Sequence, residues 1–289
     1  LSKSRGLAAN GLRKFMEDSE TDDQFMNARR QLFLGFTLPI IEKYNAVLSA
    51  RGEIDFNDMI NQAANLVQQK GAAKAYDYII IDEYQDISAA RFKLITEIRQ
   101  RSGARLVCVG DDWQSIYRFT GSDISLFSDF GKFVGEHEKL FIERTYRNSQ
   151  QLIDISAKFI QQNSQQLAKN PKSSKQLDCP VEFVVYGQNN AFAVLVDQIR
   201  QIVAEYGVDQ HILLLGRHSF DLDYVICQRD NKGKVVKSQL REEVKKYNEA
   251  TGALILTGFE NVDIKFITVH KSKGLEADNV IVLNLKNDL

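Results

Sequence analysis

The clearest pattern in the sequence is an apolar run that stops at two adjacent acids. Residues 79–81 are all isoleucine, without polar alternation, and they are followed by Asp82 and Glu83. A continuous β-branched run predicts a strand buried on both faces of a parallel sheet. Because ligands of open α/β sheets lie beyond the carboxyl ends of the strands, both acids are expected at a binding crevice. One carboxylate there can hold Mg²⁺ while its neighbour orients or deprotonates an attacking water; the alternative is a strand end with solvated acids.

A second run with the same kind of ending follows. Residues 105–110 lead to another acidic pair, Asp111 and Asp112. The segment between the two runs, 88–103, has apolar residues at helical spacing, a serine suited to cap its start and a glycine suited to end it. The sequence therefore predicts a β-α-β unit with a right-handed crossover, which brings both acidic pairs to one edge of a sheet.

The first 75 residues predict helices. Apolar residues recur at spacings of three and four over 25–48, where Pro39 interrupts them, so one kinked helix or two helices are expected. A further helix is expected to open at Asp55 and to end at Gly71. These apolar stripes are expected to pack in a core and to support the sheet.

The second half of the chain alternates candidate strands with candidate helices. Helices are expected after Ser149 and over 192–203, a turn at 230–233, and a charged helix over 240–248. This alternation predicts a second parallel α/β sheet. Its strands are expected at 181–186, 211–215, 266–269 and 280–285.

Composition narrows the class of protein. The net charge of -1 gives no sign of a nucleic-acid partner, so any such surface is a local patch. Cys108, Cys179 and Cys227 lie far apart, which argues against a disulfide framework or a zinc site and favours a cytoplasmic location. No segment approaches the ~18 apolar residues of a membrane span. The first residue is Leu1 rather than methionine, so an excised fragment is expected.

A loop that follows the second acidic pair carries further chemistry. Gln114 is close enough in sequence to reach the same pocket, where its amide can bind a phosphate oxygen or a water. Tyr117 and Phe119 flank Arg118, an arrangement that can stack nucleobases. The alternative is a loop whose aromatic side chains anchor it to the core.

Several of these stretches resemble conserved motifs of UvrD/Rep-type superfamily 1 DNA helicases. Residues 81–86 resemble motif II, and residues 109–119 resemble motif III. Residues 55–60 resemble a segment that precedes motif II, 143–149 resemble motif IV, and 267–276 resemble motif V. The matches occur in the family's order and cover most of the chain.

This resemblance implies an α/β fold with two incomplete RecA-like lobes of the P-loop NTPase type, each with a parallel sheet. Residues 1–54 would be a helical segment, 55–138 part of the first lobe with motifs II and III, and 139–289 part of the second lobe with motifs IV and V.

The resemblance also implies roles in ATP binding and hydrolysis. Asp82 would bind Mg²⁺, and Glu83 would activate the attacking water. Gln114 would sense the γ-phosphate, Tyr146 would pack beside the adenine, and Arg147 would reach the γ-phosphate. Arginine supplies fixed positive charge for the transition state of phosphoryl transfer.

The remaining implied roles concern DNA and its coupling to the nucleotide. Tyr117 and Phe119 match aromatic positions that meet single-stranded DNA. His270 and Lys273 fall where motif V couples nucleotide to DNA, and Glu276 matches an acid near the ribose and the phosphates. The implied partners are single-stranded DNA and junctions of duplex with single strand, in DNA repair and with 3′ to 5′ polarity.

The sequence also departs from the family pattern. It has no Gly-x-x-x-x-Gly-Lys-Ser/Thr loop, and no arginine follows Arg241, as motif VI would require. Thr120 stands where many relatives have arginine. We therefore expect a fragment of an ATP-dependent DNA helicase that is inactive alone. A non-catalytic nucleic-acid- or protein-binding remnant of the fold is the alternative, and a metal nuclease is a third and weaker one.

Overall fold

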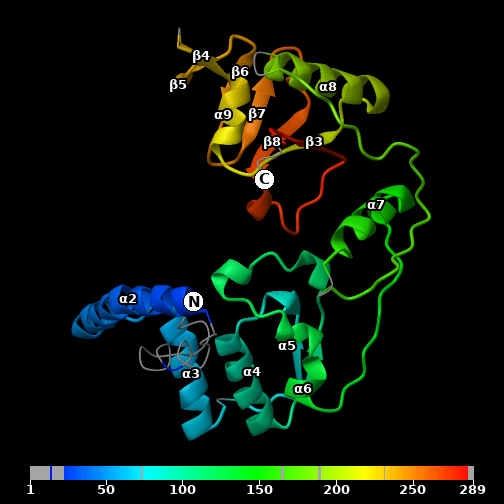
Figure 1. The fold of residues 1–289 in the computed structure, drawn as a ribbon. Coiled ribbons are helices and arrows are strands. Elements are labelled where there is room, and N and C mark those ends of the chain that lie inside the picture. Colours follow the sequence, from blue (N-terminus) through cyan, green and yellow to red (C-terminus); the bar gives the residue numbers. More distant parts are fainter. Residues whose placement is uncertain are drawn as a thin grey trace. The chain divides into compact units, whose positions relative to one another are not determined.

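The computed structural model describes residue 14 and residues 23–285, except 73, 164–165, 188–189 and 231. The chain divides into two compact units, residues 1–180 and 181–289, and each is described by itself (Figure 1). The helices expected within residues 1–22 lie outside the described residues, apart from residue 14. The domain limits expected after residues 54 and 138 remain predictions.

Two helices open the first unit. Helix α2, Gln24–Arg51, begins at Asp23, whose carboxylate accepts hydrogen bonds from two backbone N–H groups of the first turn. It continues through Pro39, so the single-helix alternative holds. Helix α3, Phe56–Lys70, is capped by Asp55 in a capping box, and it ends at a glycine as expected.

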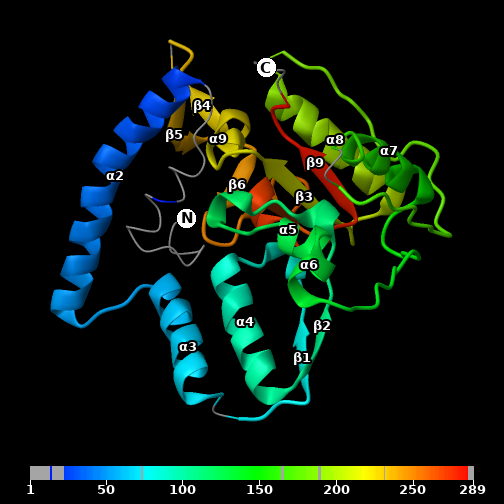
Figure 2. The ribbon, with the colours of Figure 1, turned by 60° about the horizontal axis from the view of Figure 1, so that its bottom comes forward.

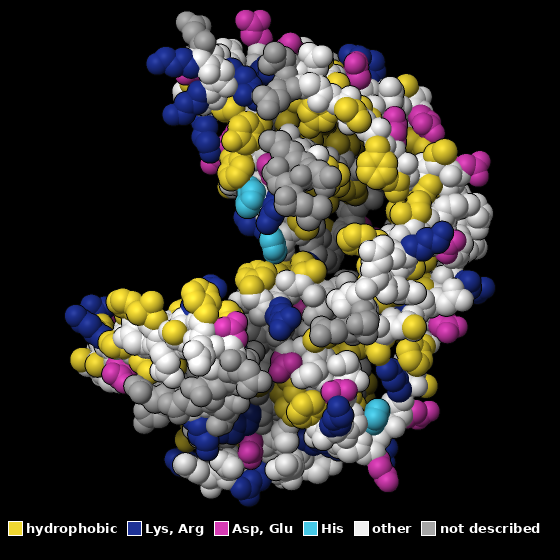
Figure 3. All heavy atoms as spheres, in the orientation of Figure 1, with side chains coloured by type: hydrophobic (Ala, Val, Ile, Leu, Met, Phe, Trp, Pro, Cys, Tyr) yellow, Lys and Arg dark blue, Asp and Glu magenta, His cyan; other side chains and the backbone are white. Residues whose placement is uncertain are grey.

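One face of α2 remains open to solvent. Figure 3 shows hydrophobic side chains along this helix, and Phe25, Phe33, Phe36 and Ile40 are 57% to 75% exposed. The expected core packing of this apolar stripe is therefore wrong for the described part of the chain. Amphipathic spacing shows that a helix has an apolar face, but not which element covers that face.

The expected β-α-β unit is present. Strands β1, Tyr78–Ile81, and β2, Arg105–Cys108, pair in parallel, with Tyr78 opposite Arg105 and Ile81 opposite Cys108. Helix α4, Ala89–Ser102, connects them, and Figure 2 shows it alongside the strands. Ser88 caps its start and Gly103 its end in the left-handed conformation, as the sequence predicts.

Only one face of this two-stranded sheet is covered. Ile81 and Cys108 pack against Tyr84, Ile87 and Leu126. On the opposite face Tyr78, Ile80 and Val107 are 57%, 72% and 42% exposed. The expectation that the isoleucine run is buried on both faces is therefore wrong, because no described element packs on that second face.

Short elements complete the first unit. The apolar run 139–142 is exposed and forms no strand. The expected helix after Ser149 is present as α7, Gln150–Ile160, and its first turn donates to the Ser149 hydroxyl. The other elements are the 3₁₀ turns η2, Tyr84–Asp86, η3, Asp112–Gln114, and η4, Arg118–Thr120, and the helices α5, Ser125–Ser128, and α6, Phe130–Val134.

The second unit is built on a mixed five-stranded sheet in the order β6-β7-β8-β3-β9. Strands β8, β3 and β9 are parallel, whereas β6, β7 and β8 are antiparallel. The purely parallel sheet expected here is therefore only its central part. The strands of this sheet are β3, His211–Gly216; β6, Val244–Tyr247; β7, Ala253–Leu256; β8, Asp263–Thr268; and β9, Asn279–Val282. A separate two-stranded sheet pairs β4, Cys227–Arg229, with β5, Val235–Leu240, in antiparallel orientation.

Helices cover this sheet and complete its core. The expected helix is present as α8, Ala191–Tyr206, which ends at Gly207. Helix α9, Phe220–Ile226, follows β3. Their apolar side chains are buried with those of the central strands, including Leu195, Ile199, Leu222, Ile212 and Ile264. None of the described helices is long and apolar enough to cross a membrane.

Two further expectations for the second unit are wrong. Residues 181–186 form no strand, and Phe183 is 83% exposed, because no described strand pairs with them. Residues 240–248 contain the end of β5 and all of β6 instead of a charged helix. A bulge in β6 shifts its pairing, so the inward-facing residues of this strand have a spacing that resembles helical periodicity. The turn expected at 230–233 includes residue 231, which lies outside the described residues. At its described ends the Gly233 N–H donates to the Asp230 carbonyl and the Asp230 N–H donates to the Lys234 carbonyl, both at 2.9 Å.

Candidate functional site

The two strand ends are joined by backbone hydrogen bonds. Beyond β1 and β2, the Val109 N–H donates to the Ile81 carbonyl at 2.8 Å, and the Tyr84 N–H donates to the Val109 carbonyl at 2.9 Å. The acidic pairs that begin at Asp82 and Asp111 follow these contacts directly. The structure therefore places both pairs at one edge of the sheet, as the sequence predicts.

Asp82 and Glu83 form a sharp turn out of β1. Glu83 has a φ of 50°, in the left-handed region, and its N–H donates to Asp82 Oδ1 at 2.8 Å. Both residues are exposed. A non-glycine residue in this region carries backbone strain, which is frequent where a carboxylate must be presented at a functional site.

Gln85 connects the two acidic pairs, and the sequence interpretation did not include it. Its side chain is completely buried, its Nε2 donates to Glu83 Oε2, and its Oε1 accepts the Asp111 N–H at 2.9 Å. An amide suits this position because it donates and accepts at once. Its place within residues 81–86, the stretch that resembles motif II, was the available signal.

Asp111 extends this hydrogen-bonded chain to Gln114. The Gln114 Nε2 donates to Asp111 Oδ2 at 2.9 Å, and Lys169 Nζ lies against Asp111 Oδ1. Partial burial raises the pKa of Asp111, but hydrogen bonds from Lys169 and Gln114 and the charge of Lys169 outweigh it, so the pKa is lowered. Glu83 and Gln114 are thus linked through Gln85 and Asp111.

Asp112 points inward and binds a different segment. Only 1% of this residue is exposed, and its carboxylate forms an ion pair with Lys169. Its Oδ2 accepts the Leu167 N–H at 2.7 Å, and the Leu167 carbonyl accepts the Trp113 indole N–H at 3.0 Å. The Lys169 ammonium lies 5.4 Å from the centroid of the Trp113 ring. Asp112, Trp113 and Lys169 were not among the expected site residues, since nothing in their spacing links residues 112 and 169.

Tyr117 and Phe119 form a paired aromatic surface. Their ring centroids are 6.1 Å apart at an interplanar angle of 64°, and Phe119 is 60% exposed. The 3₁₀ turn η4 holds them, with the Thr120 hydroxyl bonded to the Tyr117 carbonyl at 2.8 Å. Phe119 is too exposed to anchor the loop in the core, so its ring remains accessible to a ligand.

Tyr146 and Arg147 lie at a bend just before α7. Tyr146 is 66% exposed, and Arg147 is exposed as well. The Arg147 carbonyl accepts a hydrogen bond from Lys175 Nζ at 3.2 Å, and its N–H donates to the Thr145 hydroxyl at 3.4 Å. The structure therefore fixes the backbone here while both side chains reach solvent.

His270, Lys273 and Glu276 belong to the second unit. They lie between β8 and β9, on and after the 3₁₀ turn η5, Val269–Lys271. His270 and Glu276 are exposed and Lys273 is partly buried. The three follow the carboxyl end of the central parallel strand β8, where α/β sheets commonly bind ligands.

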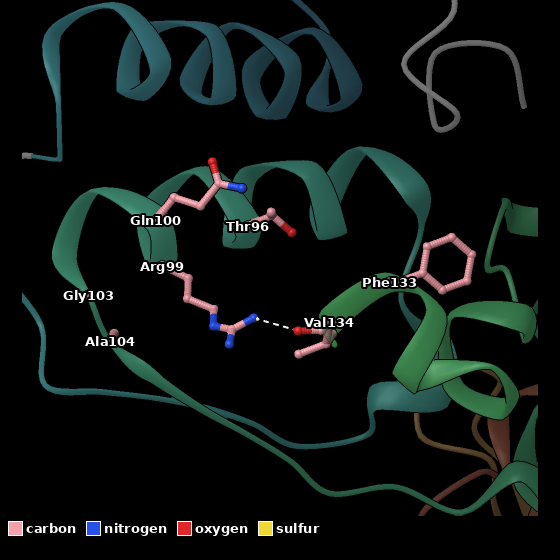
Figure 4. A pocket seen from close by; sticks show the side chains of 7 residues that line it. All are labelled: Thr96, Arg99, Gln100, Gly103, Ala104, Phe133 and Val134. Atoms are coloured by element: carbon pink, nitrogen blue, oxygen red, sulfur yellow. Dashed lines mark hydrogen bonds between the residues drawn. The ribbon is translucent and has the colours of Figure 1, made fainter. Parts of the chain in front are cut away.

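A hollow elsewhere in the first unit is separate from these residues. It measures about 410 Å³ and lies between α4 and α6, where Arg99 donates a hydrogen bond to the Val134 carbonyl at 3.4 Å (Figure 4). None of the candidate site residues lines it. Among the described residues there is also no group of three or more histidine, cysteine or acidic side chains that could hold a metal by themselves.

Sequence comparisons show which family of proteins the first unit is similar to. Residues 8–134 match the family model of the UvrD/REP helicase N-terminal domain. The resemblance to UvrD/Rep-type DNA helicases is thereby confirmed.

Individual relatives make the likeness more specific. The chain is 29% identical over 254 residues to DNA helicase IV of Escherichia coli K12, a match that covers 86% of this chain. It is 27% identical over 168 residues to the putative ATP-dependent DNA helicase YjcD of Bacillus subtilis 168, covering 56% of this chain and 22% of that protein. It is 31% identical over 131 residues to the ATP-dependent DNA helicase PcrA of Staphylococcus aureus Mu50, covering 44% of this chain and 18% of that protein. The sequence predicts this likeness to DNA helicase IV through Trp113 after the acidic pair and the Phe-Thr-Gly-Ser-Asp run that begins at Phe119.

These matches cover only part of each relative. The chain spans 32% of the length of DNA helicase IV. What the whole protein binds and catalyses is therefore a proposal.

Proposed function

We propose that this chain is part of an ATP-dependent DNA helicase that couples ATP hydrolysis to movement along single-stranded DNA. The observation that carries the proposal is the hydrogen-bonded chain Glu83–Gln85–Asp111–Gln114. It links a carboxylate that would deprotonate water to an amide that would bind the γ-phosphate. Such a link would let the presence of the γ-phosphate alter the loop that follows Gln114.

Mg²⁺ fits the residues at the end of β1. Asp82 is exposed, and its Oδ1 accepts a hydrogen bond from the Glu83 N–H, which orients the carboxylate. Mg²⁺ in such sites is held by one or two carboxylates together with substrate phosphates and water, so a larger protein cluster is not required. Asp82 would hold the ion, which would neutralise charge on the β- and γ-phosphates, and Glu83 would orient and deprotonate the water.

The nucleotide and DNA contacts are part of the same proposal. Arg147 would supply positive charge to the γ-phosphate, and Tyr146 would pack beside the adenine. Tyr117 and Phe119 would stack on bases of single-stranded DNA, and this assignment is supported by the exposure of Phe119. In the second unit, His270 and Lys273 would transmit nucleotide state to DNA, and Glu276 would contact the nucleotide.

The finer assignments follow the family. We propose that the two units contain parts of two RecA-like lobes, that movement runs 3′ to 5′, that junctions of duplex and single strand are substrates, and that the protein acts in the cytoplasm. Because no Gly-x-x-x-x-Gly-Lys loop is present in the 289 residues, we also propose that this chain alone hydrolyses no ATP.

The test compares this chain with a longer chain that includes the flanking length present in the relatives. ATP hydrolysis is measured with and without single-stranded DNA. The longer chain should hydrolyse ATP in a DNA-stimulated manner, and Glu83→Gln should lower kcat about 10²- to 10⁴-fold while ATP still binds. Glu138→Gln, which changes another exposed carboxylate of the first unit, is the matched control.

Three results would count against the proposal. Full ATPase activity in Glu83→Gln would remove Glu83 as the base. An equal loss in Glu138→Gln would show that the effect is not specific to the site. DNA binding without hydrolysis in the longer chain would favour the non-catalytic binding remnant, for which the Tyr117–Phe119 pair would be the site.

A further inference from the structure

Residues 166–175 follow α7, and we call them the connecting segment. Their first end is hydrogen-bonded to the loop that carries Gln114. The Leu167 N–H donates to Asp112 Oδ2 at 2.7 Å, and the Trp113 indole donates to the Leu167 carbonyl at 3.0 Å. Lys169 forms ion pairs with both Asp111 and Asp112. Backbone and side chain therefore hold this end together.

The other end of the connecting segment is bonded to the stretch that carries Arg147. The Lys172 N–H donates to the Glu143 carbonyl at 2.7 Å, and the Thr145 N–H donates to the Lys172 carbonyl at 2.9 Å. This forms an isolated parallel bridge, and Lys175 Nζ bonds to the Arg147 carbonyl at 3.2 Å. A short segment thus joins two places that are distant in sequence.

We propose that the connecting segment couples the position of Gln114 to that of Arg147, and that Lys169 is the positioning residue at its first end. This inference rests on the proposed function, in which both residues meet the γ-phosphate. The physical reason is that a short peptide bonded at both ends transmits a displacement, because neither end moves without breaking hydrogen bonds.

The ion pair between Lys169 and Asp112 is largely shielded from solvent. The side chain of Lys169 is 20% exposed, and that of Asp112 is 1% exposed, so water screens this pair weakly. Removing the ammonium would leave two adjacent carboxylates without a cation. Asp111 also accepts the hydrogen bond of Gln114, so its displacement would release Gln114. Lys169 therefore acts on Gln114 through Asp111.

The first test uses this chain itself. Trp113 is the only tryptophan in the sequence, so in the folded chain tryptophan fluorescence reports on the surroundings of this residue. Lys169→Met should shift Trp113 emission and raise hydrogen exchange at the Thr145 and Lys172 amides about tenfold, whereas Lys169→Arg should restore both. Lys158→Met, an exposed lysine on α7, should change neither. A Trp113 shift without any change at these amides would overturn the coupling.

A second variant changes the other end of the connecting segment, in case Lys169→Met does not fold. Gln150 accepts the Ser173 N–H at 2.8 Å and donates to the Pro171 carbonyl at 3.3 Å. Because coupling is reciprocal, Gln150→Leu should shift the Trp113 emission in a chain whose circular dichroism is unchanged. Unchanged Trp113 emission in that folded variant would contradict the proposal.

The last arm measures ATP hydrolysis in the longer chain. Lys169→Met should lower kcat about tenfold with little change in KM, and Lys169→Arg should recover most of the loss. Equal kcat in Lys169→Met and wild type would overturn the positioning role. If the wild-type longer chain hydrolyses no ATP, the proposed function fails, and the role of Lys169 in catalysis fails with it. Hydrogen exchange and Trp113 emission would still show whether the two ends of the connecting segment are coupled.

Discussion

A Cβ atom at Gly110 would lie 2.5 Å from Oε1 of Gln85, so these two residues share the narrow space between the ends of β1 and β2. The same atom would lie 3.1 Å from the Tyr84 backbone nitrogen. Gln85 cannot withdraw without losing its bonds to Glu83 and to the Asp111 N–H. The glycine between the second strand and its acidic pair is therefore required by close packing.

Gly110→Ala should consequently destabilise the first unit by about 1–3 kcal/mol, as expected for overpacking against a buried polar side chain. Urea unfolding followed by Trp113 fluorescence measures this change. Gly35→Ala is the control, because Gly35 lies in helix α2 with open space around it, and alanine there should be neutral or stabilising. Equal stability of Gly110→Ala and wild type would show that the strand ends are looser than the structure indicates.

Phe119→Ala should weaken binding of single-stranded DNA by about 1–3 kcal/mol, or about 5- to 150-fold in Kd, because the exposed ring would lose its stacking on a base. Fluorescence anisotropy with a labelled oligonucleotide measures the Kd. Phe159→Ala removes another exposed phenylalanine, 74% exposed on α7, and should leave the affinity unchanged. An identical Kd for Phe119→Ala and wild type would eliminate the stacking role.

The free energy of unfolding of the first unit should decrease as the pH falls below about 4. The pKa of Asp111 is lowered in the folded chain, chiefly because Lys169 overcomes the effect of burial. A carboxyl group whose pKa is lowered on folding stabilises the folded chain at pH values above its unfolded-state pKa of about 3.9. This contribution is lost as the pH falls through the pKa of the folded state. Urea unfolding between pH 7 and pH 3, read at Trp113, measures this slope.

Lys169→Met is the control for the acid titration. Without the ammonium the pKa of Asp111 should return towards or above its ordinary value, and the acid-dependent loss of stability should shrink. The explanation would be wrong if the variant and the wild type lost stability equally over this pH range.

The cysteines should differ sharply in reactivity. Burial raises the pKa of the Cys108 thiol to about 12, and Cys227 is buried with a raised pKa, whereas Cys179 is exposed. Since the thiolate is the reactive species, native protein at pH 8 should react rapidly with a thiol reagent at Cys179 alone. Peptide mapping after brief labelling identifies the site, and complete labelling in urea is the control. Rapid labelling of Cys108 would show that its strand opens readily.

Features that depend on neighbouring residues follow directly from the sequence. The isoleucine run before Asp82, the serine and glycine that bound α4, and the spacing of α8 act through local backbone preferences, and all appear where the pattern predicts them. The resemblance to UvrD/Rep-type DNA helicases likewise follows from the order of the motifs, because each motif is a short local string.

Tertiary structure alone decided which faces are covered and which distant residues meet. Ile80 and the α2 stripe are apolar but exposed, because burial depends on a partner element that periodicity does not name. Within residues 240–248, Val244–Tyr247 form strand β6 because pairing with β7 and a bulge override their helical spacing. Lys169 meets Asp112 because the chain folds back after α7, and an ion pair between residues so far apart leaves no trace in local sequence.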